Sequence, residues 1–444
     1  MSRLFGTDGV RGIANRKLTP ELAFQLGSAA ASVLLHGKAK AAVLLGKDPR
    51  ASGDLLEASL AAGFMSGGAD VISIGVVPTP AVAYLTKHLP VQAGAMISAS
   101  HNPVEDNGIK FFSHEGYKLP DSIEDEIEAV IASPKTIEDR PVGIHVGRWM
   151  TKPHAVQEYL EALLQSVPSL DLTGKRVVLD GANGSASAYA GNLFRRLGAE
   201  VIEIHASPNG ENINYQCGST HMSSLQKEVV EQRAHYGFAF DGDADRCLAV
   251  DQHGQLVDGD QIMAYCAIQW KNQGKLAKNT LVVTVMSNLG LHKVLRNHNI
   301  SCVITGVGDR YVLEAMKNNS YVLGGEQSGH VIFSDFATTG DGMLTALQLS
   351  LLLQQNQTTM AEAAAMMRRF PQILLNVKVE DKTIMMKNEK FLERIRHEEE
   401  LLAERGRILV RPSGTEQLIR IMVEAEKEEE AVEIARRIKE AMPQ

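Results

Sequence analysis

The chain has 444 residues, with 45 lysines and arginines against 53 aspartates and glutamates and a net charge of -8 at pH 7. Phosphate backbones are bound by surplus basic charge, so this acidic balance disfavours a general nucleic-acid-binding protein. No uncharged run reaches the roughly 18 residues of a membrane span, the N-terminus has no apolar leader segment, and the cysteines form no CxxC pair. We therefore expect a cytoplasmic protein that binds neither nucleic acid nor membranes.

Three successive regions repeat one pattern, in which short apolar runs rich in valine and isoleucine are separated by stretches of helical periodicity. Strand, helix, strand at this spacing predicts parallel sheets with right-handed crossovers. The expected strands are 42–45, 71–74 and 95–97, then 177–179, 201–204 and 236–240, then 281–285, 302–305 and 321–323. The expected helices are 21–35, 55–66, 186–197, 290–298 and 310–318.

The pattern changes after about residue 370, where polar and apolar residues alternate and the helices become densely charged. Strands are expected at 373–379, 407–410 and 418–424, and helices at 387–404 and 428–441, which predicts a small α+β domain with an antiparallel sheet. The predicted fold is three similar α/β domains with mixed, mainly parallel sheets, plus this C-terminal domain. The predicted domain boundaries are 1–150, 151–255, 256–370 and 371–444.

Residues 94–103 read Gly-Ala-Met-Ile-Ser-Ala-Ser-His-Asn-Pro, a short apolar run followed by residues that end a strand. Asn102 and Pro103 break any regular continuation, so Ser100 falls in a turn at the end of the predicted strand. Ligands of open α/β sheets collect at the carboxyl ends of strands, so we interpret Ser100 as a reacting hydroxyl. A Ser/Asn turn that caps a helix is the alternative for this stretch taken alone.

The third strand of the second region is followed by three acids at alternate positions, Asp241, Asp243 and Asp245. Carboxylates this close repel one another unless a cation lies among them, and Mg²⁺ is the first choice because phosphate is the expected co-ligand. A calcium EF-hand loop is excluded, because its sixth position would be Arg246 instead of glycine and its twelfth Gln252 instead of glutamate.

The third strand of the third region ends in the glycine-rich run 324–330. Its glycines allow a ligand to approach the backbone, and Glu326, Ser328 and His330 offer polar groups that suit a polyhydroxylated ligand. A glycine-rich turn with incidental polar residues is the alternative.

The C-terminal region contains a run with the parts of a phosphate clamp at 411–416. Arg411 supplies a guanidinium group, Ser413 and Thr415 supply hydroxyls, and Gly414 frees backbone N–H groups. An ordinary hairpin turn is the alternative.

Two further segments add positive charge, Arg11 in the glycine-flanked run 6–12 and Lys110 close in sequence to Ser100. The chain has neither a Gly-x-x-x-x-Gly-Lys-Ser/Thr loop nor a Gly-x-Ser-x-Gly elbow, which argues against a P-loop kinase and an α/β-hydrolase esterase. Four features together fit phosphoryl transfer: Ser100, a metal loop at 241–246, a sugar-type loop at 324–330 and a phosphate clamp at 411–416.

Five motifs, at 6–12, 98–103, 241–246, 324–330 and 411–416, together resemble the α-D-phosphohexomutase superfamily over essentially the whole chain. The resemblance implies four domains around a central cleft, a phosphoserine at Ser100, and one Mg²⁺ held by Asp241, Asp243, Asp245 and a phosphoserine oxygen. It also implies interconversion of glucosamine 6-phosphate and glucosamine 1-phosphate, a step toward UDP-N-acetylglucosamine and cell-wall precursors.

In this scheme phosphorylated Ser100 gives its phosphoryl group to the free sugar hydroxyl and forms glucosamine 1,6-bisphosphate, which turns around and returns its other phosphoryl group. One clamp must therefore accept either phosphate. The expected roles are charge stabilisation for Arg11 and Arg246, proton movement for Lys110, His101 or His330, sugar binding for Glu326 and Ser328, and phosphate binding for Arg411, Ser413, Gly414 and Thr415.

Three alternatives stay open at this stage. A mutase of the same superfamily could act on glucose or mannose phosphates. A phosphatase could use Asp241 as its nucleophile, although the serine loop would then have no task. A non-catalytic sugar-phosphate sensor would bind without turnover. The expected partner is a small sugar phosphate, and a homodimer is an open prediction.

Overall fold

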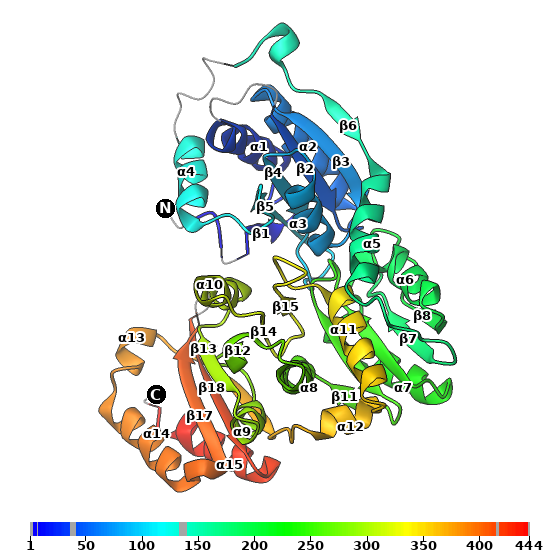
Figure 1. The fold of residues 1–444 in the computed structure, drawn as a ribbon. Coiled ribbons are helices and arrows are strands. Elements are labelled where there is room, and N and C mark those ends of the chain that lie inside the picture. The colour runs from blue at the N-terminus through cyan, green and yellow to red at the C-terminus, as the bar shows by residue number, and fades with distance from the viewer. Residues whose placement is uncertain (1–2, 7, 36–40, 133–139, 414–416, 443–444) are drawn as a thin grey trace. The chain divides into compact units, whose positions relative to one another are not determined.

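The computed structural model describes residues 3–6, 8–35, 41–132, 140–413 and 417–442 (Figure 1). The chain divides into two compact units, one made of Met1–Val285 and Ser301–Ala364 and the other of Met286–Ile300 and Ala365–Gln444. The first unit contains three sheets and the second contains a fourth.

The first sheet has the strand order β1-β5-β4-β2-β3-β6. Strands β2, β3, β4 and β6 are parallel, whereas β5 and β1 are antiparallel to their neighbours. Val43 and Leu45 share a core with residues of α1 and α2, and a Cβ atom at Gly46 would lie 2.5 Å from Val82 of α3. Helices therefore cover both faces, as alternation along β2 requires. The strands are Val10–Ile13 (β1), Ala42–Lys47 (β2), Asp70–Val76 (β3), Ala93–Ile97 (β4), Asp106–Ser113 (β5) and Trp149–Thr151 (β6), and the helices are Pro20–Leu34 (α1), Ser52–Ser66 (α2), Thr79–His88 (α3) and Asp121–Ala132 (α4).

The second sheet has the order β11-β10-β9-β7-β8. Its first strand in the chain, β7, pairs in parallel with both β8 and β9, and β10 then returns antiparallel to β9. This repeats the arrangement of β2, β3, β4 and β5 in the first sheet. The strands are Arg176–Asp180 (β7), Glu200–Ile204 (β8), Tyr236–Phe240 (β9), Cys247–Asp251 (β10) and Leu256–Val257 (β11), and the helices are Val156–Gln165 (α5), Ala190–Arg196 (α6) and Ser223–Glu231 (α7).

The third sheet, in the order β13-β12-β14-β15, shows the same arrangement again. Strand β12 is parallel to β13 and β14, and β15 returns antiparallel to β14. Helices α8 and α11 are buried along almost their whole length, so their sequences carry no polar face and no helical period. The elements are Thr280–Thr284 (β12), Ser301–Thr305 (β13), Leu323–Gly325 (β14), Val331–Phe333 (β15), Gly259–Asn272 (α8), Asp309–Asn319 (α10), Gly342–Gln355 (α11) and Met360–Ala365 (α12).

The second unit is built on the antiparallel sheet β16-β18-β17. It also includes α9, although α9 lies between β12 and β13 in the sequence. The Asn288 side chain fixes this helix, because it donates to the Phe370 carbonyl and accepts from the Phe370 N–H at 2.9 Å each. The elements are Leu289–Asn297 (α9), Gln372–Lys378 (β16), Lys382–Met385 (α13), Glu389–Leu402 (α14), Gly406–Pro412 (β17), Leu418–Ala425 (β18) and Glu428–Glu440 (α15).

The predicted fold class, mixed and mainly parallel α/β sheets followed by a small antiparallel sheet with helices, is confirmed. Each expected strand overlaps a strand of the structure, although the run expected at 321–323 lies two residues later, at Leu323–Gly325. Among the described residues, the helices are all too short or too polar to cross a bilayer.

Candidate active site

Ser100 lies in the turn that joins β4 to the antiparallel strand β5. The turn is closed by a hydrogen bond from the Asn102 N–H to the Ala99 carbonyl at 3.0 Å. Ser100 has a φ of 51°, a left-handed conformation that few residues other than glycine and asparagine adopt. Its side chain is almost fully buried, and its Oγ donates to Asp241 Oδ2 at 2.6 Å. The predicted nucleophile and the predicted metal loop are therefore in contact.

Asp241, Asp243 and Asp245 form a buried group in the turn between β9 and β10. One carboxylate oxygen from each lies within 4.8 Å of the others. Ala244 takes a φ of 58° between the second and third acid, and its carbonyl accepts a hydrogen bond from the Gly342 N–H at 3.0 Å. This tight turn brings the three acids together in space.

The three carboxylates have the charge and the open coordination that a cation needs. Burial raises the pKa of Asp241 well above its usual value, and the negative charges of Asp245 and Asp243 raise it further. Asp243 Oδ1 and Asp245 Oδ1 are buried and accept no hydrogen bond from any described residue. Buried carboxylate oxygens without donors are expensive unless a cation binds them, so the trio fits a hard divalent ion such as Mg²⁺.

Lys110 of β5 points its ammonium group at the same acids. Its Nζ lies 3.3 Å from Asp243 Oδ2, 3.6 Å from Asp245 Oδ2 and 3.7 Å from Asp8 Oδ1. Burial acts to lower the pKa of Lys110, but these carboxylates outweigh it and raise the pKa above its ordinary value. Lys110 is therefore a permanent positive charge beside the trio.

Arg11 and Arg246 add two guanidinium groups. Arg11 is on β1, whose residues pair with β5, and it forms an ion pair with Asp8. Arg246 follows the acidic turn, where its N–H donates to Asp241 Oδ1 at 3.2 Å and its Nε lies 3.9 Å from Asp245 Oδ1. Together with Lys110, they place three positive charges among the four carboxylates of Asp8 and the trio.

Two histidines border the reacting oxygen and the metal loop. His101 Nδ1 lies 3.3 Å from Ser100 Oγ. Burial lowers the pKa of His101 to about 4, and the neighbouring Arg246 and Arg11 act in the same direction. His330, at the start of β15, is buried with its Nε2 4.0 Å from Asp245 Oδ2 and 3.2 Å from the Gly340 N–H, from which it accepts a hydrogen bond.

Glu326 and Ser328 lie in the turn between β14 and β15. Glu326 Oε1 accepts from the Gly308 N–H at 3.1 Å, and the Ser328 Oγ is buried without a hydrogen-bond partner among the described residues. The Gly329 carbonyl in this turn accepts from the Cys247 N–H at 3.0 Å, directly after Arg246. The sugar-type loop and the metal loop are therefore tied to one another.

Arg411 and Ser413 belong to the second unit, at the end of β17. Arg411 pairs in register with Arg420 of β18, and burial together with this second cation lowers the pKa of Arg411. Two adjacent guanidinium groups attract an anion. The predicted clamp residues Gly414 and Thr415 lie outside the described residues.

Among the described residues that the structure brings to this site, sequence reasoning missed Asp8, Asp48, Arg50, Asn214 and Thr79, whose hydroxyl donates to Asp243 Oδ2 at 2.6 Å. Asp8 lies within the predicted run 6–12 and could have been found there as a partner for nearby cations. Asp48 and Arg50 follow β2, which neighbours β4, so the strand-end rule used for Ser100 applies to them as well. Asn214 lies in a long loop, and no sequence pattern points to it.

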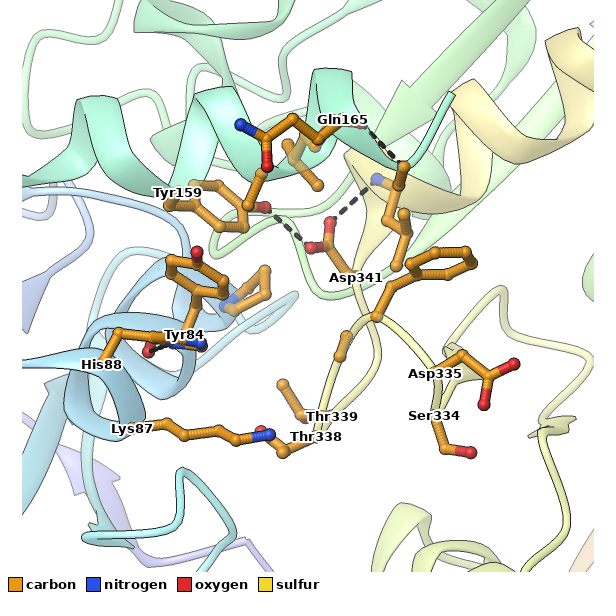
Figure 2. Close-up of a pocket in the computed structure, with 17 residues that line it drawn as sticks. Tyr84, Lys87, His88, Tyr159, Gln165, Ser334, Asp335, Thr338, Thr339 and Asp341 are labelled. Atoms are coloured by element: carbon orange, nitrogen blue, oxygen red, sulfur yellow. Dashed lines mark hydrogen bonds between the residues drawn. The ribbon is translucent and has the colours of Figure 1, made fainter. Parts of the chain in front are cut away.

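A pocket beside the site contains none of the predicted residues (Figure 2). It lies among α3, α5 and the segment before α11, and Asp341 forms part of its wall. Asp341 accepts from the Tyr159 hydroxyl at 2.8 Å and from the Leu344 N–H at 2.9 Å, and burial raises its pKa to about 6. Asp341 thus caps the N-terminus of α11, and the next residue, Gly342, donates its N–H to the Ala244 carbonyl of the metal loop.

A family assignment follows from four models of phosphoglucomutase/phosphomannomutase domains. Alpha/beta/alpha domains I, II and III match residues 2–138, 157–254 and 258–370, and the C-terminal domain matches residues 374–441.

Individual relatives and solved structures agree with these domain matches. A curated phosphoglucosamine mutase from Clostridium novyi is 52% identical over 437 residues, which is 98% of this chain and 97% of the relative. A crystal structure of a phosphoglucomutase/phosphomannomutase family protein from Burkholderia thailandensis is 24% identical, has a TM-score of 0.81, and matches over 99% of this chain and 97% of that one. The N-acetylphosphoglucosamine mutase of Aspergillus fumigatus, solved with GlcNAc-6P and magnesium, is 18% identical with a TM-score of 0.71 over 99% of this chain and 95% of that one. The two structures share the fold, and the four domain models together with the 52% identity show that the chain belongs to the phosphoglucomutase/phosphomannomutase family.

Proposed function

We propose that this protein interconverts glucosamine 6-phosphate and glucosamine 1-phosphate, the reaction of a phosphoglucosamine mutase. The observation that carries the proposal is the hydrogen bond of 2.6 Å between the Ser100 hydroxyl and Asp241, within a buried group of three carboxylates. The choice of an amino sugar rests on the Clostridium novyi relative, which bears that name and is 52% identical over 98% of this chain.

The reaction proceeds in two transfers of one phosphoryl group each. In the first, the bond from phosphorus to Ser100 Oγ breaks and a bond to the C1 hydroxyl oxygen of glucosamine 6-phosphate forms, which gives glucosamine 1,6-bisphosphate. The hydroxyl proton leaves to a base, and Ser100 regains a proton. After the intermediate turns around, its 6-phosphoryl group passes to Ser100 in the same way and leaves glucosamine 1-phosphate.

Asp241, Asp243 and Asp245 would hold one Mg²⁺, together with an oxygen of phosphorylated Ser100. When bound, the ion neutralises charge on the transferring group. Support comes from the buried Oδ1 atoms of Asp243 and Asp245, which accept no hydrogen bond from any described residue.

The remaining charges and protons are assigned to residues around Ser100. Lys110 and Arg246 would stabilise the transferring charge, with Arg11 beside them. His101 is the proposed proton acceptor, because its Nδ1 lies 3.3 Å from Ser100 Oγ and the raised pKa of Lys110 keeps that side chain protonated. His330 is the second candidate, because its Nε2 lies 4.0 Å from Asp245.

The substrate would be held at its two ends. Glu326 and Ser328 are proposed to bind sugar hydroxyls, supported by the buried and unpartnered Ser328 Oγ. Arg411, Ser413, Gly414 and Thr415 are proposed to bind whichever phosphate is not reacting, supported by the adjacent Arg411 and Arg420.

The deciding experiment compares purified wild-type protein, Ser100→Ala and the control Ser169→Ala, which replaces an exposed serine. Each is given the 1-phosphates of glucosamine, N-acetylglucosamine, glucose and mannose. We expect isomerisation to be fastest with glucosamine 1-phosphate, abolished in Ser100→Ala and unchanged in Ser169→Ala. Full mutase activity in Ser100→Ala contradicts the proposal, and release of inorganic phosphate without isomerisation favours a phosphatase.

All four cysteines lie among the described residues and none forms a disulfide, which supports a reducing location such as the cytoplasm. Homodimer formation stays a prediction, and light scattering on the purified protein tests it.

A further inference from the structure

The peptide groups on both sides of Ser100 are fixed by buried side chains. The Ser100 N–H donates to Ser98 Oγ at 2.9 Å, and the Ser98 hydroxyl donates to Asp48 Oδ2 at 2.6 Å. The Ser100 carbonyl accepts from Arg50 at 3.0 Å and from the Asn214 side-chain amide at 2.8 Å. Two side chains therefore donate to the Ser100 carbonyl, and the Ser98 hydroxyl links the Ser100 N–H to Asp48.

Arg50 is a fully buried fork aimed at the carbonyl groups of this turn. Besides Ser100, its guanidinium group donates to the carbonyls of Asn102 at 2.8 Å and Asp106 at 3.0 Å, and to that of Pro103. Its Nε donates to Asp48 Oδ2 at 2.9 Å, so the carboxylate of Asp48 pairs with the buried positive charge of Arg50. Five N–H donors in a rigid plane make arginine suited to such a task, and a lysine ammonium has fewer donors and no plane.

Asn214 reaches the same carbonyls from the second α/β region. Its amide donates to the Ser100 carbonyl and, at 3.0 Å, to the Asn102 carbonyl. Its own N–H donates to the Ala182 carbonyl at 2.9 Å. Arg50 and Asn214 thus support one carbonyl from two different sheets.

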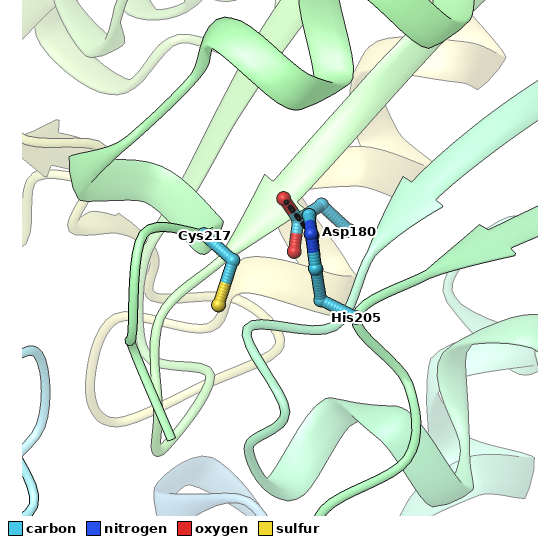
Figure 3. Close-up of side chains that lie close together, drawn as sticks. All are labelled: Asp180, His205 and Cys217. Carbon is cyan, nitrogen blue, oxygen red and sulfur yellow. Dashed lines mark hydrogen bonds and ion pairs between the residues drawn. The ribbon is translucent and has the colours of Figure 1, made fainter. Parts of the chain in front are cut away.

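The loop that carries Asn214 is anchored at both ends on Asp180 of β7. Figure 3 shows Asp180 close to His205 and Cys217. At one end the His205 imidazole pairs with Asp180 Oδ2 at 3.0 Å, and at the other the Gly218 N–H donates to the same oxygen at 3.0 Å. Cys217 lies beside them, where its sulfur accepts from Asn183 at 3.9 Å. These contacts give hydrogen-bond partners to Asp180, His205 and Cys217, and they hold the two ends of the loop at the end of β7.

The Ser100 carbonyl needs such support because the turn is both strained and tightly enclosed. Ser100 has a left-handed φ of 51°, which its side chain disfavours. A Cβ atom at Gly242 of the metal loop would lie only 2.6 Å from the Ser100 carbonyl oxygen, so the two turns touch through this carbonyl. Rotation of this peptide group would move Ser100 Oγ away from Asp241.

We propose that Arg50 and Asn214 are positioning residues for phosphoryl transfer: they hold the Ser100 carbonyl, and through it they aim Ser100 Oγ at the aspartate trio. The inference rests on the proposed function, because it concerns the geometry of the same transferring oxygen. Neither residue reaches Ser100 Oγ itself. Misplacement of a reacting atom by about 1 Å can slow a reaction by about a hundredfold.

The test uses Asn214→Gly with Gln216→Gly as its matched control. Asn214 has a φ of 58° and Gln216 a φ of 52°, so glycine fits both positions without strain and raises the unfolded-state entropy equally. Gln216 is exposed and lies on the same loop. Arg50→Lys is the second variant, because it keeps the positive charge beside Asp48 and removes the planar fork.

We expect kcat to fall at least tenfold in Asn214→Gly and in Arg50→Lys, with KM within twofold of wild type and unchanged values in Gln216→Gly. The rate of a single transfer from phosphorylated Ser100 to glucosamine 6-phosphate, followed by rapid quench, should fall by the same factor. A purely structural role would lower the thermal midpoint and leave the rate per folded molecule unchanged, and that result overturns the inference. So does a raised KM at constant kcat. If Ser100→Ala retains turnover, the proposed function fails; if Ser100→Ala is inactive while Asn214→Gly has wild-type kcat, only this inference fails.

Discussion

Replacing Lys110 with methionine removes an ammonium group that lies within 3.7 Å of the carboxylates of Asp8, Asp243 and Asp245. At an effective dielectric constant of about 20, the pair at 3.3 Å is worth about 5 kcal/mol and each of the other two about 4.5 kcal/mol. Desolvation of the buried ion offsets several kcal/mol of this sum, and loss of one partner from a buried ion pair costs about 3–5 kcal/mol. We therefore expect Lys110→Met to lower the free energy of unfolding by about 3–5 kcal/mol.

Urea unfolding followed by tryptophan fluorescence measures this loss in the right part of the molecule. Both tryptophans, Trp149 and Trp270, belong to the first unit. With a slope of about 3 kcal/mol per molar urea, the midpoint should fall by about 1–1.7 M without added metal. Saturating Mg²⁺ should narrow the difference, because the ion replaces positive charge among the same carboxylates.

The control is Lys87→Met, which changes an exposed lysine and should stay within about 0.5 kcal/mol of wild type. If Lys110→Met unfolds at the same urea concentration as this control, the carboxylates do not depend on Lys110 for their neutralisation. The trio would then not need a nearby positive charge for the stability of the fold.

Three further results are expected. Asp243→Asn and Asp245→Asn should each weaken Mg²⁺ binding by at least a hundredfold in calorimetric titration, because each removes a charged ligand; wild-type affinity in both variants would exclude the trio as the site. The pKa of His101 is lowered to about 4 by burial and two nearby guanidinium groups. Between pH 6.5 and 4 the imidazole is therefore protonated in the unfolded chain but not in the folded one, and the free energy of unfolding decreases as the pH falls. From pH 7 to pH 5 this imidazole should contribute a loss of about 2 kcal/mol in urea unfolding, absent in His101→Gln, and an equal loss in the variant would show that other groups cause it. Glu326→Ala should raise KM for glucosamine 1-phosphate about tenfold with a smaller change in kcat, and an unchanged KM would remove Glu326 from the sugar site.

Nine strands of the three α/β regions were predicted, because each overlaps a short apolar run: β2, β3, β4, β7, β8, β9, β12, β13 and β14. The remaining six, β1, β5, β6, β10, β11 and β15, were not predicted. Strands such as β4 and β9 are covered on both faces and read as continuous apolar runs. Strand β5 is one of those not predicted, since Asn107 and Gly108 are typical of turns and lysine is uncommon in strands, yet Asn107 and Lys110 are buried in it. Local propensity gives way there because Lys110 is held by carboxylates of another sheet.

The parts of the candidate site that could be predicted are those whose chemistry is local in the sequence. The alternating acids and the serine turn each suggest a function from a few neighbouring residues. Arg50 follows strand β2, so its place at the strand ends was within reach of the sequence, but its task was not, because it donates to carbonyl groups, which every residue possesses. Asn214 donates to the same carbonyl from a long loop, and only the contact itself reveals it.

Three turns of the first unit, from β4 to β5, from β9 to β10 and from β14 to β15, suggest why one arrangement of strands recurs. In each sheet the third strand lies beside the central first strand and is followed by an antiparallel return, so its carboxyl end becomes a tight turn instead of a long crossover. Each turn contains a residue with positive φ, namely Ser100 at 51°, Ala244 at 58° and Gly329 at 92°. Such a residue reverses the chain within a few positions and leaves neighbouring side chains pointing outward from the end of the sheet. Only the third turn uses glycine for this. In the first, the strained residue is the proposed nucleophile itself, so the conformation that a serine disfavours is the one that directs its oxygen at Asp241, and the surrounding donors must maintain it.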